Sequence, residues 1–589
     1  MVATQCQELS LVVSILNFNN HIMNKLLYII FTVGIVVTLT SCTKDPEKYP
    51  LEGLTEDYVF DPNDKNGIGA EQFLNNIYSH LPTGFNRISG DFLASATDDA
   101  LPSRNNNNPI EVLRTARMNS STSNPDDAWS DSYTGIRKAN IFLSKIDITP
   151  VDEQVKNYWK ADARFLRAMF YFELVKRYGG IPLLGDVVFT ATDNIDLPRN
   201  TFEECVNYIV SELDAIQDLV RPYNASVTTD EDWGRITKGA VLTLKAKILN
   251  YAASPLYNGG NIAIGTPSAA FQGYLDEDIN RWQKAADAAK DVIDLGIYAL
   301  APYTDIFIQR KNSEMILAKL RPTTRDIMLI NGPIAYEGAN LKGQGMTSPT
   351  QNLVDAFHTV NGNSIDSDPA YSPNNPYANR DPRLALSVFL NGTNWLQRPL
   401  EFFEGGRDKP NIPGQYQTRT GYYSKKYMNF RFQTSAEYSL QHVNYQIFRY
   451  ADVLLMYAEA LNELNSTAPQ EVHEILGNIR KRAGIREANN YGVPATLTQA
   501  EARDLIQLER RLEFFMEEQR YWDVRRWKIA ETEFNKNLEG MRITKSGSSL
   551  NYEKFVADQI VFEAPRMYMY PIPNVEILRN TNLVQNIGW

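Results

Sequence analysis

The feature that most constrains the fold is a run of apolar residues at helical spacing before a Gly-Gly-Ile-Pro stop. The apolar positions alternate at intervals of three and four residues, which places them on one face of an α-helix; they are Tyr158, Ala161, Phe165, Ala168, Phe172 and Val175. Gly179, Gly180 and Pro182 end this helix. A second run, interrupted by Gln519, comprises Leu505, Leu508, Leu512, Phe515 and Trp522. Amphipathic helices must bury their apolar faces, so we expect a core of helices packed on helices.

Other segments have the same periodicity, whereas strand patterns are few and short. We expect further helices at 70–80, 130–146, 202–219, 238–253, 281–295, 449–464 and 469–482. Long polar segments separate them, at 82–127, 254–280, 321–350 and 362–417. Loops beyond about 15 residues are unusual in compact domains and tend to carry function. Because no Ser/Gly-rich or Pro-rich linker divides the chain, we predict one unit over 51–589, with an N-terminal part near 51–253 and a C-terminal part near 281–589.

One apolar run of 14 residues, 26–39, follows Lys25 near the N-terminus. It is too short to span a bilayer, which takes about 20 residues, but it suits the core of a signal peptide. The run ends in Leu39-Thr40-Ser41-Cys42, which resembles a bacterial lipobox. We predict a signal peptide over 1–41 with Met23 as its true start, lipidation of Cys42 and a polar tether over 42–50. A plain signal peptide and a buried helix are the alternatives.

Composition and motifs exclude several classes of function. A net charge of −11 argues against nucleic acid as a partner. Cys205 is the single cysteine after Cys42, so we expect a buried apolar thiol and no internal disulfide. The five histidines form no H-E-x-x-H pair, and phosphate-loop, dinucleotide and G-x-S-x-G motifs are missing. The segment 61–67 is faintly similar to a calcium loop, but Lys65 occupies a ligand position, which favours a turn.

Many short blocks follow one another along the rest of the chain. They are Trp129 with Tyr133, Ile136, Ala139 and Asn140, then 160–168, 178–183, 234–240, 349–357, 379–383, 449–460, 480–484, 509–527, 570–573 and 583–589. Each block alone is modest. Together, in this order and behind a lipobox, they closely resemble the SusD/RagB family of nutrient-binding outer-membrane lipoproteins.

The resemblance implies a mainly α fold, in which tetratricopeptide-like helix pairs form a scaffold for long irregular loops. It also implies a role without catalysis: a lipid-anchored protein facing the cell exterior captures a glycan and delivers it to a SusC-like TonB-dependent transporter. The sequence itself offers no metal-binding residues and no cofactor motif. A peptide ligand is the alternative within the family. A surface glycoside hydrolase stays open as a second alternative, because 70 acidic residues offer many pairs of carboxylates.

In family members the ligand site is built from loops, which correspond here to 82–127 and 321–350; the polar loop around Trp395 is a third candidate. Sugars stack on aromatic rings and hydrogen-bond to planar polar groups. The candidate ligand-binding residues are Phe85, Arg87, Arg104, Asn105, Tyr336 and Trp395. Aromatic residues make up 11% of the chain, but many of them fall on helix faces, so their abundance is weak evidence for sugar binding.

Several arginines of the predicted helices have acids close by in the sequence. Guanidinium groups pair bidentately with carboxylates, so we predict ion pairs between helices rather than ligand contacts for Arg164, Arg167, Arg510 and Arg526, with Asp162, Glu513 and Asp523 as nearby acids. We also expect the C-terminal segment, from Tyr570 to Trp589, to pack back on the scaffold.

Overall fold

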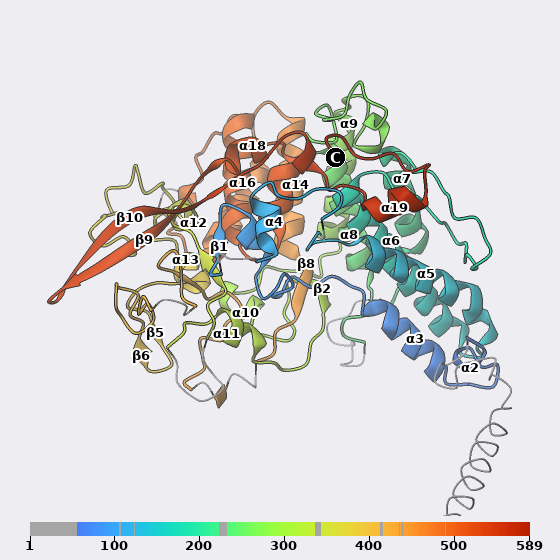
Figure 1. The fold of residues 1–589 in the computed structure, drawn as a ribbon, viewed down its shortest axis with the longest axis horizontal. Coiled ribbons are helices and arrows are strands. Elements are labelled where there is room, and N and C mark those ends of the chain that lie inside the picture. Colours follow the sequence, from blue (N-terminus) through green and yellow to red (C-terminus); the bar gives the residue numbers. More distant parts are fainter. Residues whose placement is uncertain are drawn as a thin grey trace, which may run out of the picture. The chain divides into compact units, whose positions relative to one another are not determined.

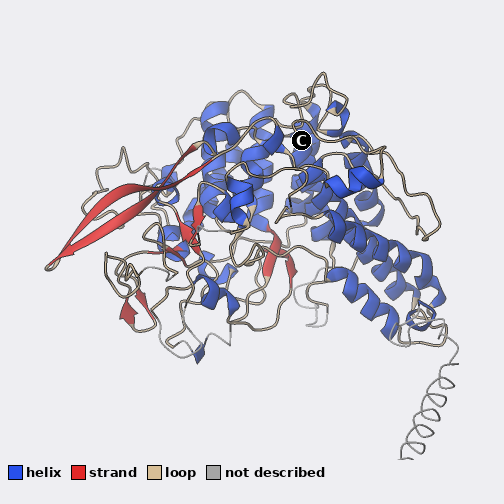
Figure 2. Cartoon of the chain, in the orientation of Figure 1, coloured by secondary structure: helices blue, strands red, loops and turns tan. Residues whose placement is uncertain are grey.

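Helices form most of the regular structure in the residues that the structure describes (Figures 1 and 2). The computed structural model describes residues 56–104, 108–122, 124–222, 232–335, 343–412, 416–434, 436–437, 441–488 and 490–589. Residues 62–589 form one compact unit; residues 1–61 form another, of which the short helix α2 (Glu56–Val59) is described. The predicted signal peptide, Cys42 and the tether over 42–50 lie outside the described residues.

Helix α6 (Glu153–Tyr178) confirms the helix predicted from the first apolar run. The carboxylate of Asp152 caps its start by accepting the backbone N–H of Gln154 at 2.8 Å. The helix ends at Gly179, which adopts φ 75°, and a Cβ there would lie 2.2 Å from the carbonyl oxygen of Phe271. From residue 161 onward α6 is buried on nearly all sides, because neighbouring helices pack against several of its faces.

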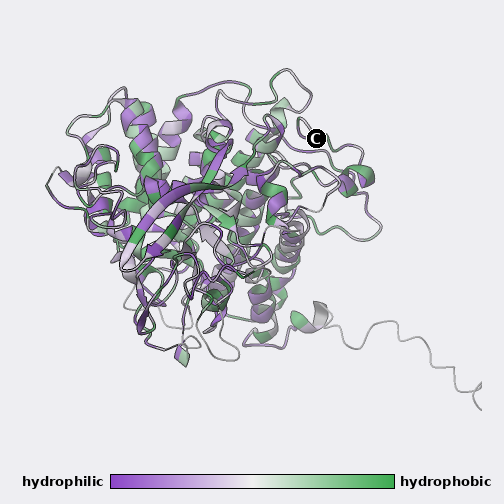
Figure 3. Cartoon of the chain, turned by 60° about the vertical axis from the view of Figure 1, so that its left-hand side comes forward, coloured by the Kyte–Doolittle hydropathy of each residue, from purple (hydrophilic) through white to green (hydrophobic). Residues whose placement is uncertain are grey.

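Successive long helices pack against one another in chain order. They are α3 (Ile68–Tyr78), α5 (Trp129–Lys145), α6, α7 (Phe202–Ile216), α8 (Lys238–Ala253), α9 (Asn280–Asp294), α14 (Tyr450–Leu464), α15 (Gln470–Ala483), α16 (Gln499–Glu513) and α17 (Gln519–Arg526). Contacts run from α5 through α6, α7 and α8 to α9, and α9 packs on α14, which contacts α15 and α16. In Figure 3 these helices carry hydrophobic and hydrophilic residues side by side, as expected of amphipathic helices. The mainly α prediction is confirmed.

Short elements lie between the long helices, and several of them fall inside the predicted loops. The short α-helices are α4 (Ile110–Arg114), α10 (Tyr303–Ile306), α11 (Asp326–Asn331), α12 (Gln351–Ala356), α13 (Pro382–Ser387), α18 (Ala530–Glu533) and α19 (Asn574–Arg579). The 3₁₀ turns are η1 (Leu93–Ala96), η2 (Ile146–Ile148), η3 (Ala269–Phe271), η5 (Asn490–Gly492) and η6 (Arg566–Tyr568).

The described strands form antiparallel pairs rather than one large sheet. The pairs are β1 (Ala100–Pro102) with β3 (Thr347–Pro349), β2 (Met315–Lys319) with β8 (Tyr445–Arg449), β4 (Val388–Phe389) with β7 (Tyr423–Ser424), β5 (Asn394–Trp395) with β6 (Arg398–Pro399), and β9 (Lys536–Ser546) with β10 (Ser549–Ile560). The first two pairs join segments far apart in the sequence, so they fix the position of loops relative to the helices.

The β9–β10 hairpin corrects the prediction that strands are few and short, because its strands have 11 and 12 residues. Figure 1 shows it projecting as a long ribbon. Most of β10 is exposed or half-buried, and its pairing register shifts between Val556 and Asp558. Its apolar residues also do not alternate regularly with polar ones along the strand. Without that alternation a strand has little sequence signal.

The predicted ion pairs between helices are confirmed, with partners that the sequence did not specify. Arg164 and Arg167 both bind Glu212 of α7, at 2.9 and 2.7 Å. Arg510 of α16 binds Asp523 of α17 at 2.9 Å, and Arg526 of α17 binds Glu459 of α14 at 2.6 Å. Of the other nearby acids, Asp162 pairs with Arg221 and Glu513 binds three arginines.

Glu513 lies at the centre of a buried network of charges. Its carboxylate is 2.6 Å from Arg482, 2.7 Å from Arg449 and 3.0 Å from Arg383. Burial alone would raise the pKa of Glu513. The three arginines lower it by a larger amount, so the net pKa lies well below its ordinary value. Arg449 also binds Glu314 and Glu517, each at 2.6 Å. Helix α16 is therefore tied by charge to strand β8, to α15 and to the segment that leads into β2.

The C-terminal segment packs back on the scaffold as predicted. The backbone N–H of Tyr570 donates to the carbonyl of Arg177 at 2.8 Å, and the indole N–H of Trp589 donates to the carbonyl of Met569 at 3.0 Å. Cys205 is a buried free thiol, also as predicted. Burial raises its pKa to about 12, so the reactive thiolate is scarce at neutral pH.

The substitution Glu513→Gln tests the charge network. It removes the negative charge that three buried arginines face, and breaking a buried ion pair typically costs about 3–5 kcal/mol. We expect the free energy of unfolding to fall by about that amount, measured by urea denaturation at pH 7. The matched control is Glu553→Gln in the exposed pair with Arg542, which should cost less than about 1 kcal/mol. Equal losses in the two variants would contradict the role given to Glu513.

Candidate functional site

The two loops predicted to form the ligand site lie together in the structure. Strand β1 of the first loop pairs with β3 of the second, with Leu101 opposite Ser348. The pairing is extended by Ser103, whose backbone N–H donates to the carbonyl of Met346 at 2.7 Å. Further along, the amide of Asn331 donates to the side-chain oxygen of Asn86 at 2.6 Å. Segments 82–104 and 321–350 are thus joined at two places.

A third segment, 416–424, adds to the same surface. The guanidinium carbon of Arg104 lies 4.2 Å from the ring centroid of Tyr416. Arg419 donates from its backbone N–H to the hydroxyl of Ser348 at 3.3 Å and from its guanidinium to the carbonyl of Pro102 at 3.1 Å. We call the described residues 82–104, 321–335, 343–350 and 416–424 together the loop face.

Phe85 lies in the core beneath the loop face. Its side chain is 6% exposed. The ring meets those of Tyr427 and Tyr445 edge to face, with centroids 4.8 and 5.3 Å apart, and the guanidinium of Arg321 lies 5.3 Å from its centroid. Neighbouring side chains therefore cover the ring that the sequence offered as a stacking surface for sugar.

Arg87 holds the first loop to the scaffold. It binds Glu518 at 2.6 Å and Asp126 at 2.5 Å. Burial lowers the pKa of Arg87, but the two carboxylates raise it more, so the guanidinium stays charged. These ion pairs give Arg87 a structural role that does not depend on a ligand.

Trp395 lies in the β5–β6 hairpin and is 3% exposed. Its ring meets Phe389 edge to face at 4.9 Å, so the indole packs inside its own loop. The flanking residues Asn394 and Gln397 are exposed. Asn105 and Tyr336, the other two candidates, lie outside the described residues, next to the described ends of the two loops.

Arg104 is the predicted candidate that the structure leaves open to further contacts. Its side chain is half-buried, and its Nε has no hydrogen-bond partner among the residues that the structure describes. Its aromatic neighbour Tyr416, which is 47% exposed, was not predicted from the sequence. The sequence gives only a weak indication that Tyr416 belongs to a binding site. It is one of 31 tyrosines in the chain, and its position in a polar stretch with Pro413 and Gly414 is the one feature that suggests exposure.

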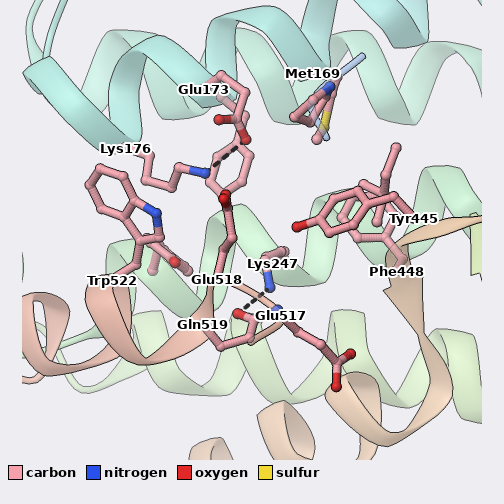
Figure 4. Close-up of a pocket in the computed structure, with 14 residues that line it drawn as sticks. Met169, Glu173, Lys176, Lys247, Tyr445, Phe448, Glu517, Glu518, Gln519 and Trp522 are labelled. Carbon is pink, nitrogen blue, oxygen red and sulfur yellow. Dashed lines mark hydrogen bonds and ion pairs between the residues drawn. The ribbon is translucent and has the colours of Figure 1, made fainter. Parts of the chain in front are cut away.

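The cavity shown in Figure 4 lies in the scaffold between α6, α8, β8 and the start of α17. Its polar side chains are paired: Lys176 donates to Glu173 at 2.8 Å and Lys247 to Gln519 at 3.2 Å. Its volume is about 50 Å³, far below the roughly 300–1,000 Å³ of typical ligand pockets. The cavity has room for water but not for a sugar.

The predicted turn at 61–67 is a helix cap. The carboxylate of Asp64 accepts backbone N–H groups from Asn66, Gly67 and Gly69 at 3.1, 3.0 and 3.2 Å. These bonds use the oxygens that a cation would need. Across the described part of the chain, no group of three or more His, Cys, Asp or Glu side chains is placed to hold a metal ion.

Asp91 is a buried carboxyl group beneath the loop face. It accepts hydrogen bonds from Asn108 at 2.7 Å, Ser95 at 3.2 Å and Thr347 at 3.3 Å, and so links the two loops. Burial raises its pKa to about 7, although these hydrogen bonds and the charge of Arg104 act in the opposite direction. The group therefore titrates near neutral pH.

A pH series tests this account of Asp91. A carboxyl whose pKa is higher in the folded state stabilises the fold most at low pH, and this contribution is lost as the pH rises from the unfolded-state value near 4 through about 7. Relative to Asp91→Asn, the wild type should lose up to about 1.4 kcal/mol of unfolding free energy per pH unit in this range. Thermal or urea unfolding at several pH values measures the difference. Parallel curves for the two proteins would contradict the raised pKa, and Asp326→Asn, at an exposed position, is the control.

Two family models match the chain one after the other. A model described as "Starch-binding associating with outer membrane" matches residues 62–249, and the model of the SusD family matches residues 317–589. A SusD-like protein of Formosa agariphila is 25% identical over 471 residues, which are 78% of this chain and 79% of that protein. A SusD-like protein of Bacteroides ovatus is 25% identical over 470 residues, 75% of each chain. In the described residues, no helix has both the length and the apolarity needed to cross a bilayer.

Solved structures share the fold over nearly the whole chain. A SusD-like protein from Bacteroides fragilis superposes with a TM-score of 0.75 at 25% identity, covering 92% of this chain and 100% of that one. A SusD-like carbohydrate-binding protein from the same species has a TM-score of 0.69 at 23% identity, covering 88% and 98%. The predicted SusD-like fold is confirmed, and the chain belongs to the SusD/RagB family.

Proposed function

We propose that this protein is a non-catalytic, lipid-anchored glycan-binding protein of the outer-membrane surface, which captures an oligosaccharide or polysaccharide on its loop face and delivers it to a SusC-like TonB-dependent transporter. Support comes from the family, one of whose models is described as starch-binding and associated with the outer membrane. A structural neighbour is named a carbohydrate-binding protein.

The observation that carries the proposal is the pair formed by Arg104 and Tyr416 at the junction of three segments. A half-exposed tyrosine offers a flat apolar surface for the C–H groups of a sugar ring, and its hydroxyl and the guanidinium offer polar partners for sugar hydroxyls. The Nε of Arg104 is buried and has no hydrogen-bond partner among the described residues, so the ligand contact is proposed for the rest of the guanidinium and for the ring of Tyr416. Asn105 and Tyr336 belong to the same proposed site, whereas Phe85, Arg87 and Trp395 would support it from beneath.

Three acids of the first loop, Asp91, Asp98 and Asp99, are poorly placed for hydrolysis. A glycosidase needs two carboxyl groups open to the substrate at a set separation. Asp91, Asp98 and Asp99 are all buried, and the last two are bound to arginines: Asp98 to Arg520 at 3.0 Å and Asp99 to Arg511 at 2.7 Å. Asp98 and Asp99 serve to hold the loop to α16 and α17.

Binding and hydrolysis are tested together on a panel of glycans and peptides, with starch included. The wild type should bind one glycan saturably and release no new reducing ends. Tyr416→Ala and Arg104→Ala should each weaken binding by about tenfold, as expected when an aromatic or arginine anchor is removed, measured by isothermal titration calorimetry.

One control keeps the aromatic ring but removes its hydroxyl, and the other removes a positive charge outside the proposed site. Tyr416→Phe keeps the ring and should retain most of the affinity, and Arg579→Ala removes an exposed arginine outside the loop face. New reducing ends, or binding of peptides but no glycan, would overturn the proposed function. Unchanged affinity in both alanine variants would remove the site but leave the function.

The membrane anchor is tested separately at Cys42. A diacylated and N-acylated cysteine holds a protein on a membrane without spanning it. Wild-type protein expressed in a Bacteroidota host should fractionate with the outer membrane, incorporate labelled fatty acid and be accessible to protease on intact cells. Cys42→Ser should abolish the label and release the protein into a soluble fraction. A labelled, membrane-bound Cys42→Ser variant would contradict lipidation at this cysteine.

A further inference from the structure

An open groove of about 490 Å³ lies between the end of α3, the turn before α8 and the end of β2. Its volume falls within the range of small-molecule sites, roughly 300–1,000 Å³. The residues that give it its chemistry are Asn75, Tyr78, Trp233, Arg235, Lys319 and Leu320. We propose that this groove, which we call the Trp233 groove, is a second glycan-binding subsite that extends the loop face; the inference rests on the proposed function.

Trp233 supplies the aromatic surface of the groove. The residue is half-buried, and its indole N–H is buried without a hydrogen-bond partner in the described part of the chain. The ammonium of Lys311 lies 5.1 Å from the ring centroid. The next residue, Gly234, adopts φ 95°, and a Cβ there would lie 2.8 Å from the side chain of Leu320. Glycine therefore lets the turn approach β2 closely and holds Trp233 at the wall of the groove. Leu320 remains 39% exposed and adds apolar surface.

The polar groups of the groove are held in place by the scaffold. The hydroxyl of Tyr78 accepts the backbone N–H of Ile236 at 3.2 Å. Arg235 binds Glu71 at 2.7 Å, and its guanidinium lies 5.2 Å from the ring centroid of Tyr78. Because Glu71 balances the charge of Arg235, this part of the groove suits a neutral polar ligand better than an anion.

Lys319 and Asn75 add hydrogen-bonding groups at the rim. The ammonium of Lys319 donates to the carbonyl of Ser79 at 2.8 Å and to that of Leu81 at 2.5 Å. An ammonium has three N–H donors, so one more is available for a sugar hydroxyl. The side chain of Asn75 is exposed. An aromatic wall with fixed hydrogen-bonding groups is the chemistry that recognises sugar rings.

The groove continues into the loop face along two stretches of chain. Tyr78, Ser79 and Leu81 line the groove just before the first loop begins, and residues 318–320 line it just before the second. The bond from Lys319 to Leu81 and the contact of Arg321 with Phe85 hold these stretches side by side as they leave the groove. These two stretches connect the groove to the loop face, and the proposal is that a polysaccharide contacts both surfaces whereas a short oligosaccharide contacts one.

The inference is tested by chain-length dependence in the full-length mature protein. The probes are amylopectin and malto-oligosaccharides of increasing length, or the corresponding series of whichever glycan the wild type binds in the panel above. Trp233→Ala should weaken binding of the polymer about tenfold, by removing one aromatic anchor and the gain from simultaneous attachment at two subsites. The shortest oligosaccharide bound at the loop face should keep its affinity, and Trp233→Phe should retain most polymer binding.

A surface variant keeps the test valid if the change at Trp233 affects folding. Asn75→Ala lies at an exposed helix position and should lower polymer affinity about threefold, the effect of losing one hydrogen bond, whereas Gln72→Ala, exposed on the same helix, should not. Wild-type polymer affinity in both Trp233→Ala and Asn75→Ala would overturn the subsite while leaving the proposed function intact. A wild type that binds no glycan would overturn both.

Discussion

Charge pairing between α16–α17 and distant segments is the interaction on which the rest of the structure depends. Glu513 of α16 binds Arg383 and Arg449, which belong to the loop-rich middle of the chain. A few residues away, Arg511 and Arg520 bind Asp98 of the first loop at 2.9 and 3.0 Å. One pair of helices therefore anchors both the scaffold and the loop face. Since these charges are buried, each is stable only with its partner in place, and this makes the loop positions specific.

Sequence periodicity predicted the helical scaffold well but could not assign roles to the aromatic residues. Helix α6 has a regular apolar stripe and glycine at its end, so its bounds follow from local rules. Phe85 and Trp395 sit in polar stretches, which suggested exposure, yet both are buried against aromatic neighbours: Tyr427 for Phe85 and Phe389 for Trp395. Burial of a loop residue depends on segments far away in the sequence, and no local pattern encodes it.

The same limitation applies to the residues that now carry the proposed site. The sequence indicated the two loops through the family resemblance, and it indicated Arg104 among their polar residues. It could not indicate Tyr416 or Trp233, because each is adjacent to its partners only after chain segments meet: Tyr416 through Arg104, and Trp233 through the close approach of Gly234 to Leu320. The sequence named Asp162, Glu513 and Asp523 as acids near the helical arginines, but it did not name Glu212, whose pairing with Arg164 and Arg167 required the fold.

The pairing of β1 with β3 brings together residues that are about 250 positions apart, such as Leu101 and Ser348. Closing so long a loop costs entropy that local helix formation does not, so contacts of this kind form late in folding. The anchors of the first loop lie later still in the chain, at Arg511 and Arg520. The loop face thus depends on contacts that reach from Asp98 to Arg520, and a chain truncated before α16 lacks the anchors of the surface that would hold a ligand.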